Sequence, residues 1–411
     1  MKDRFMKKIA ALLLACFCLS ACSAESTETG TETAGETIGH AYYQVPYPTE
    51  ETFLPDSGEH TVRMLFVRAG KADCIILEAD GLTYLIDTGE DISVPQILAG
   101  LAYMETESIE AVFLTHTDKD HIGGWDAVKQ AYSIGTLYTA LQMEAPEVYD
   151  RLAEAIPHEL LVPGQSVPIG KEGLYLDVLC PVLLYPDEEN NNSLILRMDC
   201  GEETVLFTGD MKEKEEADLL ATGYDLDCTI LKVPYHGRKD GSGSAFLEAC
   251  SPDISIICCD TVTDPDTAHK KVLERLRAYG DIYRTEDADL GWYLTIEDGQ
   301  RLLNNVRISK SPEQKLTITE ASLADQNITI RNDGEDTDLG GCFLYSDRGS
   351  EVFVIPESTR LAAGESITIG CVGTMSDLIW TGETSVWHKS KEDNAILYDR
   401  YGNVLDQKTA E

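Results

Sequence analysis

The sequence feature that most constrains this chain is a short loop in which metal-binding side chains are crowded together. The loop reads Thr115-His116-Thr117-Asp118-Lys119-Asp120-His121-Ile122-Gly123-Gly124, and it holds two of the eight histidines. Two imidazoles and two carboxylates provide nitrogen and oxygen ligands that suit zinc, manganese or iron. The loop has none of the thiolates that are typical of a closed structural zinc site. The apolar run before the loop predicts a buried strand, and strand ends are where rigid scaffolds present functional groups. The loop therefore predicts a metal site on a sheet, in preference to a polar loop with two chance histidines.

The chain around this loop alternates between short β-branched runs and amphipathic helical stretches from residue 60 to residue 309. Helices are predicted at residues 94–104 and 212–220. The Gly123-Gly124 pair is expected to let the backbone turn tightly and start another helix. Strands are predicted at residues 62–67, 74–78, 83–87, 111–115, 174–179, 193–198, 204–208 and 228–233. Interleaved strands and helices predict an α/β layered domain with helices packed on sheet faces.

A polar break at Lys310-Ser311-Pro312-Glu313 separates this region from a C-terminal region with a different pattern. Beyond the break, β-branched runs are separated by Asp-Gly, Gly-Gly and Ala-Gly turn signals. Strands are predicted at residues 328–330, 352–355 and 366–371. This spacing predicts a small all-β sandwich over residues 316–408.

The N-terminus has the layout of a secretory signal. Basic residues precede an apolar run at residues 9–19, which is shorter than the roughly 20 residues of a transmembrane helix. The run ends in Leu19-Ser20-Ala21-Cys22, which resembles the lipobox of bacterial lipoproteins and implies removal of residues 1–21 and lipidation of Cys22. An ordinary cleaved signal with a chance cysteine is the alternative. Residues 22–59 are then a lipidated cysteine and a flexible tether, which predicts an extracytoplasmic protein anchored by lipid to the bacterial cell membrane.

The charge and the cysteines exclude some classes of site. The formal charge is -39, from 72 acidic and 33 basic residues, so a nucleic-acid substrate would have to be held locally by metals and a few basic groups. The 12 cysteines include no Cys-x-x-Cys pair, which argues against a structural zinc cluster. A disulfide between Cys342 and Cys371 stays open for an oxidising compartment.

The metal loop resembles the H-x-[HD]-x-D-H signature of the metallo-β-lactamase fold, in particular the hydrolase domain of ComEC-type competence proteins. Further pieces resemble that family in the same order over about residues 60–300. They are Val67-Arg68-Ala69-Gly70-Lys71-Ala72-Asp73, Leu85-Ile86-Asp87-Thr88-Gly89, Asn191-Asn192-Ser193-Leu194-Ile195-Leu196, Phe207-Thr208-Gly209-Asp210, Lys232-Val233-Pro234-Tyr235-His236-Gly237 and Ala268-His269. The resemblance implies a metallo-β-lactamase αββα sandwich with two divalent metal ions, zinc first and manganese as the alternative.

Carried over position by position, the resemblance implies a set of metal ligands. They are His116 and Asp118 for the first metal, Asp120, His121 and His269 for the second, and Asp210 as the bridge. His236 is expected to contact the transition state or deliver a proton, with direct ligation as the alternative. Taken alone, Asp210 is also suited to cap a helix, and the two late histidines to lie on the surface.

Three departures from the family distinguish this site. Asp118 stands where β-lactamases have a second histidine, and the region of their third histidine carries Asn191-Asn192-Ser193, so antibiotic hydrolysis is disfavoured. Tyr235 stands where the family often has the first of two histidines. Arg238 follows Gly237 where the family often has serine, and an arginine there is suited to contact a phosphate. Asn192, Ser193 and Arg238 are therefore the expected substrate residues.

The chemistry that the resemblance implies is hydrolysis of a phosphodiester. Two divalent cations lower the pKa of a water toward about 7 and bind an anionic oxygen of the substrate. Asp120 is expected to orient the attacking hydroxide, and His236 to protonate the leaving group. The leading hypothesis is a surface-anchored nuclease or phosphodiesterase that acts on extracellular nucleic acid. The alternatives are a surface adhesion or scaffold protein with a degenerate hydrolase domain, and a hydrolase of another ester or small phosphodiester.

The C-terminal region resembles the lamin-tail domain, an immunoglobulin-like sandwich. The resemblance lies in turns such as Leu361-Ala362-Ala363-Gly364-Glu365-Ser366 and in the ending Ala395-Ile396-Leu397-Tyr398-Asp399-Arg400-Tyr401-Gly402. It implies a binding or positioning role toward a partner at the cell surface. Trp380, Trp387 and His388 are candidates for a contact surface, but tryptophans that fill the sandwich are the expected explanation. No basic stripe with interleaved aromatic residues supports direct DNA binding by this region.

Overall fold

The computed structural model describes residues 43–48, 53–141, 148, 152, 154–307, 312, 314–388 and 390–411. The predicted signal peptide, Cys22 and most of the predicted tether lie outside these residues. Within the part of the chain that is described, no helix combines the length and the apolar character needed to cross a membrane.

Two β-sheets face each other in the first region and share one core. The larger sheet has eight strands, in the spatial order β17 (Gln300–Val306), β16 (Gly291–Glu297), β2 (Val62–Val67), β3 (Ile75–Ala79), β4 (Leu82–Ile86), β5 (Ile109–Leu114), β6 (Ile134–Ala140) and β7 (His158–Leu161). The smaller sheet has seven, in the order β15 (Asp281–Arg284), β14 (Ile254–Ile257), β13 (Ile230–Lys232), β12 (Glu203–Phe207), β11 (Ile195–Cys200), β9 (Tyr175–Cys180) and β8 (Ser166–Pro168). Phe66 and Phe113 from one sheet and Phe207 from the other belong to the same buried apolar cluster. Burial of this shared face holds the two sheets together.

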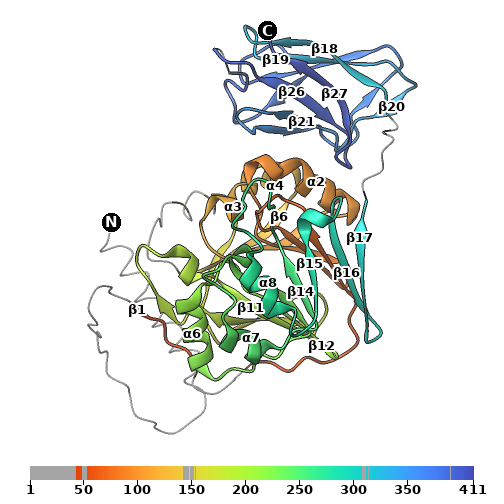
Figure 1. Ribbon diagram of the computed structural model, residues 1–411. Coiled ribbons are helices and arrows are strands. Elements are labelled where there is room, and N and C mark those ends of the chain that lie inside the picture. Colours follow the sequence, from red (N-terminus) through yellow and green to blue (C-terminus); the bar gives the residue numbers. More distant parts are fainter. Residues whose placement is uncertain are drawn as a thin grey trace.

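Helices cover the outer faces of both sheets (Figure 1). The helices α2 (Val94–Tyr103) and α4 (Trp125–Ala131) pack on the eight-stranded sheet, and α6 (Glu213–Thr222), α7 (Ser244–Cys250) and α8 (Lys270–Leu276) pack on the seven-stranded sheet. The layers therefore run helix, sheet, sheet, helix. This order confirms the predicted αββα sandwich.

The predicted elements of the first region begin and end within two residues of the observed ones. The prediction did not include β6, β7 and β8, nor β17 at the opposite edge of the larger sheet. The first three strands have weak sequence signals. These strands contain Gly135, His158 and Pro168, and several of their side chains are partly exposed, so their alternating apolar signal is weak. A short pair, β1 (Tyr43–Gln44) and β10 (Leu183–Leu184), lies outside the two main sheets.

The C-terminal region is all β, as predicted. Its sheets are β18 (Leu316–Ser322), β19 (Asn327–Asn332), β24 (Ser366–Cys371) and β25 (Leu378–Trp380); β22 (Val352–Val354), β21 (Phe343–Ser346), β26 (Asn394–Tyr398) and β27 (Val404–Thr409); and the short pair β20 (Thr337–Asp338) and β23 (Arg360–Leu361). Trp380 and Trp387 are buried in its apolar core, which confirms the interior packing expected of them. Cys342 and Cys371 are buried free thiols. The lamin-tail assignment stays a prediction.

The C-terminal region lies against the helices that cover the eight-stranded sheet (Figure 1). Phe343, Tyr345 and Val352 belong to the same buried apolar cluster as the side chains of α2 and α4. At Gly402, an added Cβ atom would lie 2.8 Å from the Cβ of Ala99 on α2, so the two backbones approach closely. The two regions are therefore joined by an apolar contact next to the helix that follows the metal loop.

Candidate metal centre

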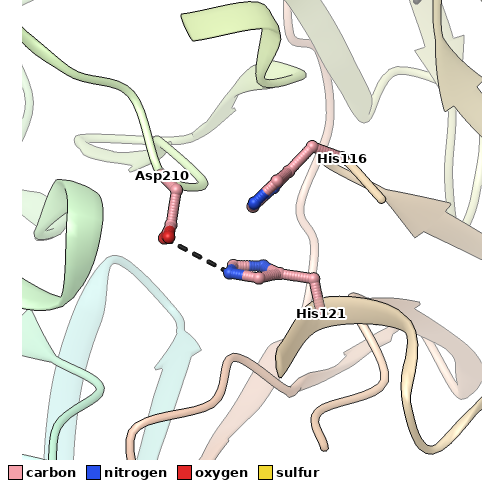
Figure 2. Close-up of side chains that lie close together, drawn as sticks. All are labelled: His116, His121 and Asp210. Carbon is pink, nitrogen blue, oxygen red and sulfur yellow. Dashed lines mark ion pairs between the residues drawn. The ribbon is translucent and has the colours of Figure 1, made fainter. Parts of the chain in front are cut away.

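Loops that follow strands of both sheets bring the predicted ligands together. The loop after β5 holds His116 and Asp118 and leads into α3 (Lys119–Ile122), which carries Asp120 and His121. Asp210 follows β12, and the 3-10 turn η3 (Pro234–Gly237), which includes His236, follows β13. The side chains of His116, His121 and Asp210 point toward one another (Figure 2). Groups distant in sequence thus form one buried cluster.

Asp210 lies at the centre of this cluster. Its Oδ1 atom is 3.3 Å from Nε2 of His121, and its Oδ2 atom is 3.1 Å from Nε2 of His236. The same Nε2 of His236 is 3.4 Å from Oδ2 of Asp120. A carboxylate that offers one oxygen on each side is suited to bridge two cations.

The three imidazoles of the centre are oriented by partners on their far side. Nδ1 of His121 is 2.7 Å from Oδ2 of Asp87, and Nδ1 of His236 is 3.1 Å from the carbonyl oxygen of Cys258. Nδ1 of His116 is 3.1 Å from the hydroxyl of Thr115. Partners of this kind fix the ring orientation and raise the basicity of the other nitrogen. All three rings therefore present Nε2 to the centre.

Several buried atoms of the centre have no hydrogen-bond partner. Among the described residues, they include Nε2 of His121, Nε2 of His236, Oδ1 of Asp210 and Oδ1 of Asp73. Leaving such an atom unpaired costs about 1–3 kcal/mol. His121 Nε2 and Asp210 Oδ1 approach to 3.3 Å without hydrogen-bond geometry, as expected for two donors that face a common cation. Nitrogen and oxygen donors without thiolate fit zinc or manganese.

The carboxylates of the centre depend on positive charge beside them. Burial lowers the pKa of His121, but the charges of Asp210 and Asp87 outweigh burial and raise that pKa well above its ordinary value. Burial raises the pKa of Asp210, but the imidazoles of His236 and His121 outweigh it and hold the pKa well below its usual range. In this state the imidazoles carry the compensating charge. Divalent cations would take over that role and release the protons.

The backbone at the centre is strained where it presents ligands. Tyr235 and His236 have φ angles of 51° and 52°, and Asp87 has a φ angle of 59°. These left-handed conformations are unfavourable for residues with side chains and persist where the surrounding structure enforces them. The strain turns His236 toward Asp210 and Asp87 toward His121.

The Gly123-Gly124 pair forms a turn, as predicted, and Gly124 directly precedes the first residue of α4. Both glycines have φ angles of the helical region, -64° and -82°, so this turn does not need the left-handed backbone that favours glycine. An added Cβ atom at Gly124 would lie 2.1 Å from the carbonyl oxygen of Thr88, and one at Gly123 would lie 2.6 Å from that of Lys119. The glycines are needed because the backbone after the metal loop packs against its neighbours.

His236 and His269 lie in different surroundings. His236 shares a ligand-sized cluster with Asp120 and His121, which favours the alternative of direct ligation. His269 caps the start of α8, where its Nδ1 accepts a hydrogen bond from the backbone N–H of Lys271 at 3.3 Å. No ligand cluster within the described residues includes His269. Its assignment as a ligand stays a prediction.

The expected substrate residues divide into two groups. Asn192 bonds the backbone of Tyr185 through both atoms of its amide, and Ser193 accepts a hydrogen bond from the backbone N–H of Asp210 at 3.1 Å. Both therefore brace loops. Arg238 is ion-paired with Asp264 and is 30% exposed, so it remains available at the surface of the centre.

The structure adds residues for which the sequence motifs predicted no role. Lys232 is fully buried, pairs with Asp73 and donates to the carbonyl oxygen of Gly209 at 2.9 Å. Lys71 donates to Oδ2 of Asp120 at 2.7 Å. Asp87 orients His121, and Asn190 contacts three of the predicted ligands. Lys71, Asp73, Asp87 and Lys232 lie inside the family-like motifs, and their place in those motifs was the signal that could have indicated a role. Asn190 directly precedes the motif that begins at Asn191.

A comparison with protein families agrees with this architecture. Residues 67–261 match the family model of the metallo-beta-lactamase superfamily. The first region thus has the fold of a metallo-beta-lactamase superfamily hydrolase, with candidate metal ligands in place.

Relatives of this chain share that region at low identity. ComE operon protein 3 of Bacillus subtilis (strain 168) is 26% identical over 198 residues, which are 46% of this chain and 24% of that protein. Recombination protein 2 of Haemophilus influenzae is 29% identical over 222 residues, which are 53% of this chain and 26% of that protein. The chain thus spans about a quarter of the length of these relatives. The matches confirm the resemblance to ComE-type proteins.

Solved structures with a similar chain path include the metallo-beta-lactamase fold protein YhfI from Bacillus subtilis. That protein aligns with a TM-score of 0.40 and 13% identity over 58% of this chain and 100% of its own. A diphosphatase of the PhnP family aligns with a TM-score of 0.36 and 14% identity, over 59% of this chain and 97% of its own.

Proposed function

We propose that this chain is a two-metal phosphodiesterase that cuts extracellular nucleic acid at the bacterial surface. The observation that carries the proposal is the position of Asp210, whose two oxygens face His121 on one side and His236 on the other. Together with His116, Asp118 and Asp120, these residues would hold two divalent cations, zinc or manganese, that share one carboxylate.

Divalent cations bound by these residues would supply activation of a water and neutralisation of the charge that develops on the phosphate. The chain's own residues position the reacting groups. Asp120 is held between Lys71 and His236, so its carboxylate has a fixed direction and would orient the attacking water. His236 acts as a ligand through Nε2, because its Nδ1 is engaged by Cys258. Lys71 then supplies a protonated side chain on the open side of the centre.

Positive side chains near the centre support an anionic substrate. The side chains of Lys71 and Arg238 are 33% and 30% exposed, whereas that of His236 is 1% exposed. The guanidinium carbon of Arg238 lies 5.5 Å from the ring centroid of Tyr235, and Nζ of Lys212 lies 5.0 Å from the same centroid. These cations counter the overall negative charge locally and would hold a phosphate.

The names of the relatives favour DNA as the first substrate to test. One matched protein belongs to the ComE operon, and the other is named for recombination, a process that acts on DNA. The fold alone does not fix the substrate. Another ester, a small phosphodiester and a scaffold role without turnover are therefore outcomes that the experiment distinguishes.

The proposal includes location and partner. Lipidation of Cys22 would anchor the protein outside the cytoplasm, and the lamin-tail-like region would bind a partner at the cell surface. The anchor is tested by labelling cells with an alkyne fatty acid. Label should appear in the wild-type chain and be absent from Cys22→Ser. Equal labelling of both would contradict the anchor.

The enzyme proposal is tested on the full-length chain purified in detergent. Its metals are counted by mass spectrometry, and hydrolysis of single-stranded DNA, double-stranded DNA and bis(p-nitrophenyl) phosphate is measured. Two ions per chain and turnover that a chelator abolishes are expected. The variants Asp120→Ala and His121→Ala should lose both. Full activity in both variants would remove the assigned site, and bound metal without phosphodiester turnover would point to another ester or to a scaffold.

A further inference from the structure

The first metal position, beside His116 and Asp118, has fewer donors than the second. Nε2 of His116 and Oδ2 of Asp118 lie 3.5 Å apart, and Asp210, which shares a ligand-sized cluster with His116 and His121, would be the third donor. The side chain of Asp118 is 42% exposed, whereas that of His116 is fully buried, so this position opens toward solvent. A four-coordinate cation would need one more donor from the chain or from solvent.

Asn190 in the 3-10 turn η2 (Glu189–Asn192) reaches this position. Its Nδ2 atom is 3.1 Å from Oδ2 of Asp118, 3.4 Å from Nε2 of His116 and 3.4 Å from Oδ2 of Asp210. The amide end of Asn190 therefore faces one candidate donor atom from each of three residues, two of which share the metal loop while Asp210 comes from a distant part of the sequence.

Two of these distances match the spacing of ligands around one cation, and the distance to Asp118 is slightly shorter. Donors bonded at about 2.0–2.2 Å in a tetrahedral site lie about 3.3–3.6 Å from one another. The amide end of Asn190 thus occupies a corner of the site. A half-turn of the amide exchanges its nitrogen for Oδ1, which is an acceptor of nearly the same size. We propose that Asn190 is a protein ligand of the first metal, through Oδ1.

The neighbours of Asn190 hold it in this place. Asn192 fixes the turn through hydrogen bonds of 2.7 and 2.9 Å with the backbone of Tyr185. The hydroxyl of Ser193 donates to the carbonyl oxygen of Asn190 at 2.9 Å and accepts from the backbone N–H of Asp210 at 3.1 Å. Ser193 therefore links the backbone of Asn190 to the backbone of Asp210, the predicted bridging ligand. The three consecutive asparagines have different roles, because one faces the centre and its neighbours brace the turn.

A neutral donor at this corner has a consequence for the substrate. A third carboxylate would cancel more of the cation's charge, whereas an amide oxygen leaves that charge available to an anionic oxygen. Asn190 thus completes the coordination without reducing attraction for a phosphate. The inference rests on the proposed two-metal site.

The test is a titration of Zn²⁺ and, separately, Mn²⁺ into the metal-free full-length chain, followed by calorimetry. The wild-type chain should bind two ions. Asn190→Ala should weaken one of the two binding events by at least about 10-fold, the lower end of losses seen for residues that merely support a ligand. Asn190→Asp, which restores an oxygen donor, should retain both events. Circular dichroism and the unaffected second event establish that the variants fold.

Asn192→Ala is the matched control, because it loosens the same turn without removing the donor. It should change affinity less than Asn190→Ala does. Two wild-type-like events in Asn190→Ala, or equal losses in both alanine variants, would overturn the role of Asn190 and leave the two-metal site intact. A wild-type chain that binds fewer than two ions would overturn the proposed site itself.

Discussion

The metal centre and the C-terminal sandwich both bury polar side chains, but the two regions differ in whether those side chains form hydrogen bonds. In the centre, Nε2 of His121, Nε2 of His236 and Oδ1 of Asp210 are buried without hydrogen-bond partners. In the sandwich, the buried Gln326 donates to the carbonyl oxygens of Leu323 and Trp387 and accepts from the backbone N–H groups of residues 386 and 387. Within the described part of the sandwich, one oxygen of Glu351 is the unpaired exception.

The difference separates polar groups that stabilise a fold from polar groups that form a site. Gln326 and the buried Asn332 tie loops to the sandwich, and their bonds are satisfied by neighbouring backbone. The buried atoms of the metal centre face ion-pair partners without hydrogen-bond geometry, so they stabilise the fold less than satisfied hydrogen bonds do. A cation that binds the folded chain and not the unfolded one would add stability.

The largest expected effect comes from removing a donor of the centre. His236→Ala should lower kcat on bis(p-nitrophenyl) phosphate by roughly 1,000-fold or more, since a metal contributes several kcal/mol to such a reaction. His269→Ala should have a much smaller effect, because that side chain caps α8. His388→Ala in the sandwich is the matched control and should leave kcat unchanged. A greater loss in His269→Ala than in His236→Ala would reverse the assignment of the last ligand.

Glu216, a buried carboxyl outside the metal centre, tests how the fold accommodates a buried acid that is not a predicted metal ligand. Burial raises the pKa of Glu216 on α6 from 4.5 to about 7, although the backbone N–H of Gly243 donates to it. The folded state therefore holds this proton more tightly than the unfolded state. Its contribution to stability is complete below about pH 4.5 and is lost as the pH rises through 7, a total of about 3 kcal/mol.

Glu216→Gln should remove this loss. In urea unfolding of metal-free protein, the variant should resemble wild type near pH 5 and be more stable at pH 8 by up to about 3 kcal/mol. Parallel stability curves for the two proteins between pH 5 and 8 would contradict the raised pKa.

Replacing a residue that orients a metal ligand should have a smaller effect than removing the ligand. The carboxylate of Asp87 accepts hydrogen bonds from His121 and from the backbone N–H of Thr115. Asp87→Asn replaces one accepting oxygen by an N–H donor, so His121 is oriented less well and zinc binding should weaken by roughly 10- to 100-fold. Competition with a chromophoric chelator measures this affinity. Asp80→Asn is the matched control, because Asp80 pairs with His60 at 2.8 Å away from the centre. Equal losses of zinc affinity in both variants would mean that general destabilisation is the cause.

The smallest effect is expected in the sandwich. Gln326→Ala would leave buried N–H and C=O groups without partners and should lower the free energy of unfolding by roughly 1–3 kcal/mol. Urea unfolding followed by tryptophan fluorescence measures the change. The number of bound metals should stay the same. A loss of metal from this variant would show that the two regions are coupled through the contact on α2 and α4.

Much of the fold was predictable because its signal is local. The strands β2 to β5 and the helix α2 carry strong apolar periodicity, and each was predicted within two residues. His116, Asp118, Asp120 and His121 were predicted as a group because they share one loop. The strands β6 to β8, at or next to the sheet edges, were missed because several of their residues are partly exposed and they include glycine and proline, which weakens that periodicity.

The sequence alone determined the donor types, the order of the motifs and the layered α/β pattern, because these depend on residue identity and local spacing. The tertiary structure decided that His236 faces Asp210 while His269 caps a helix. It also decided that Asn190 reaches the centre while Asn192 braces the turn. The physical reason is that the direction of a side chain depends on backbone angles and on partners distant in sequence. The φ angle of 52° at His236 and the contact of Asn190 with Asp118 at 3.1 Å are set by the folded chain.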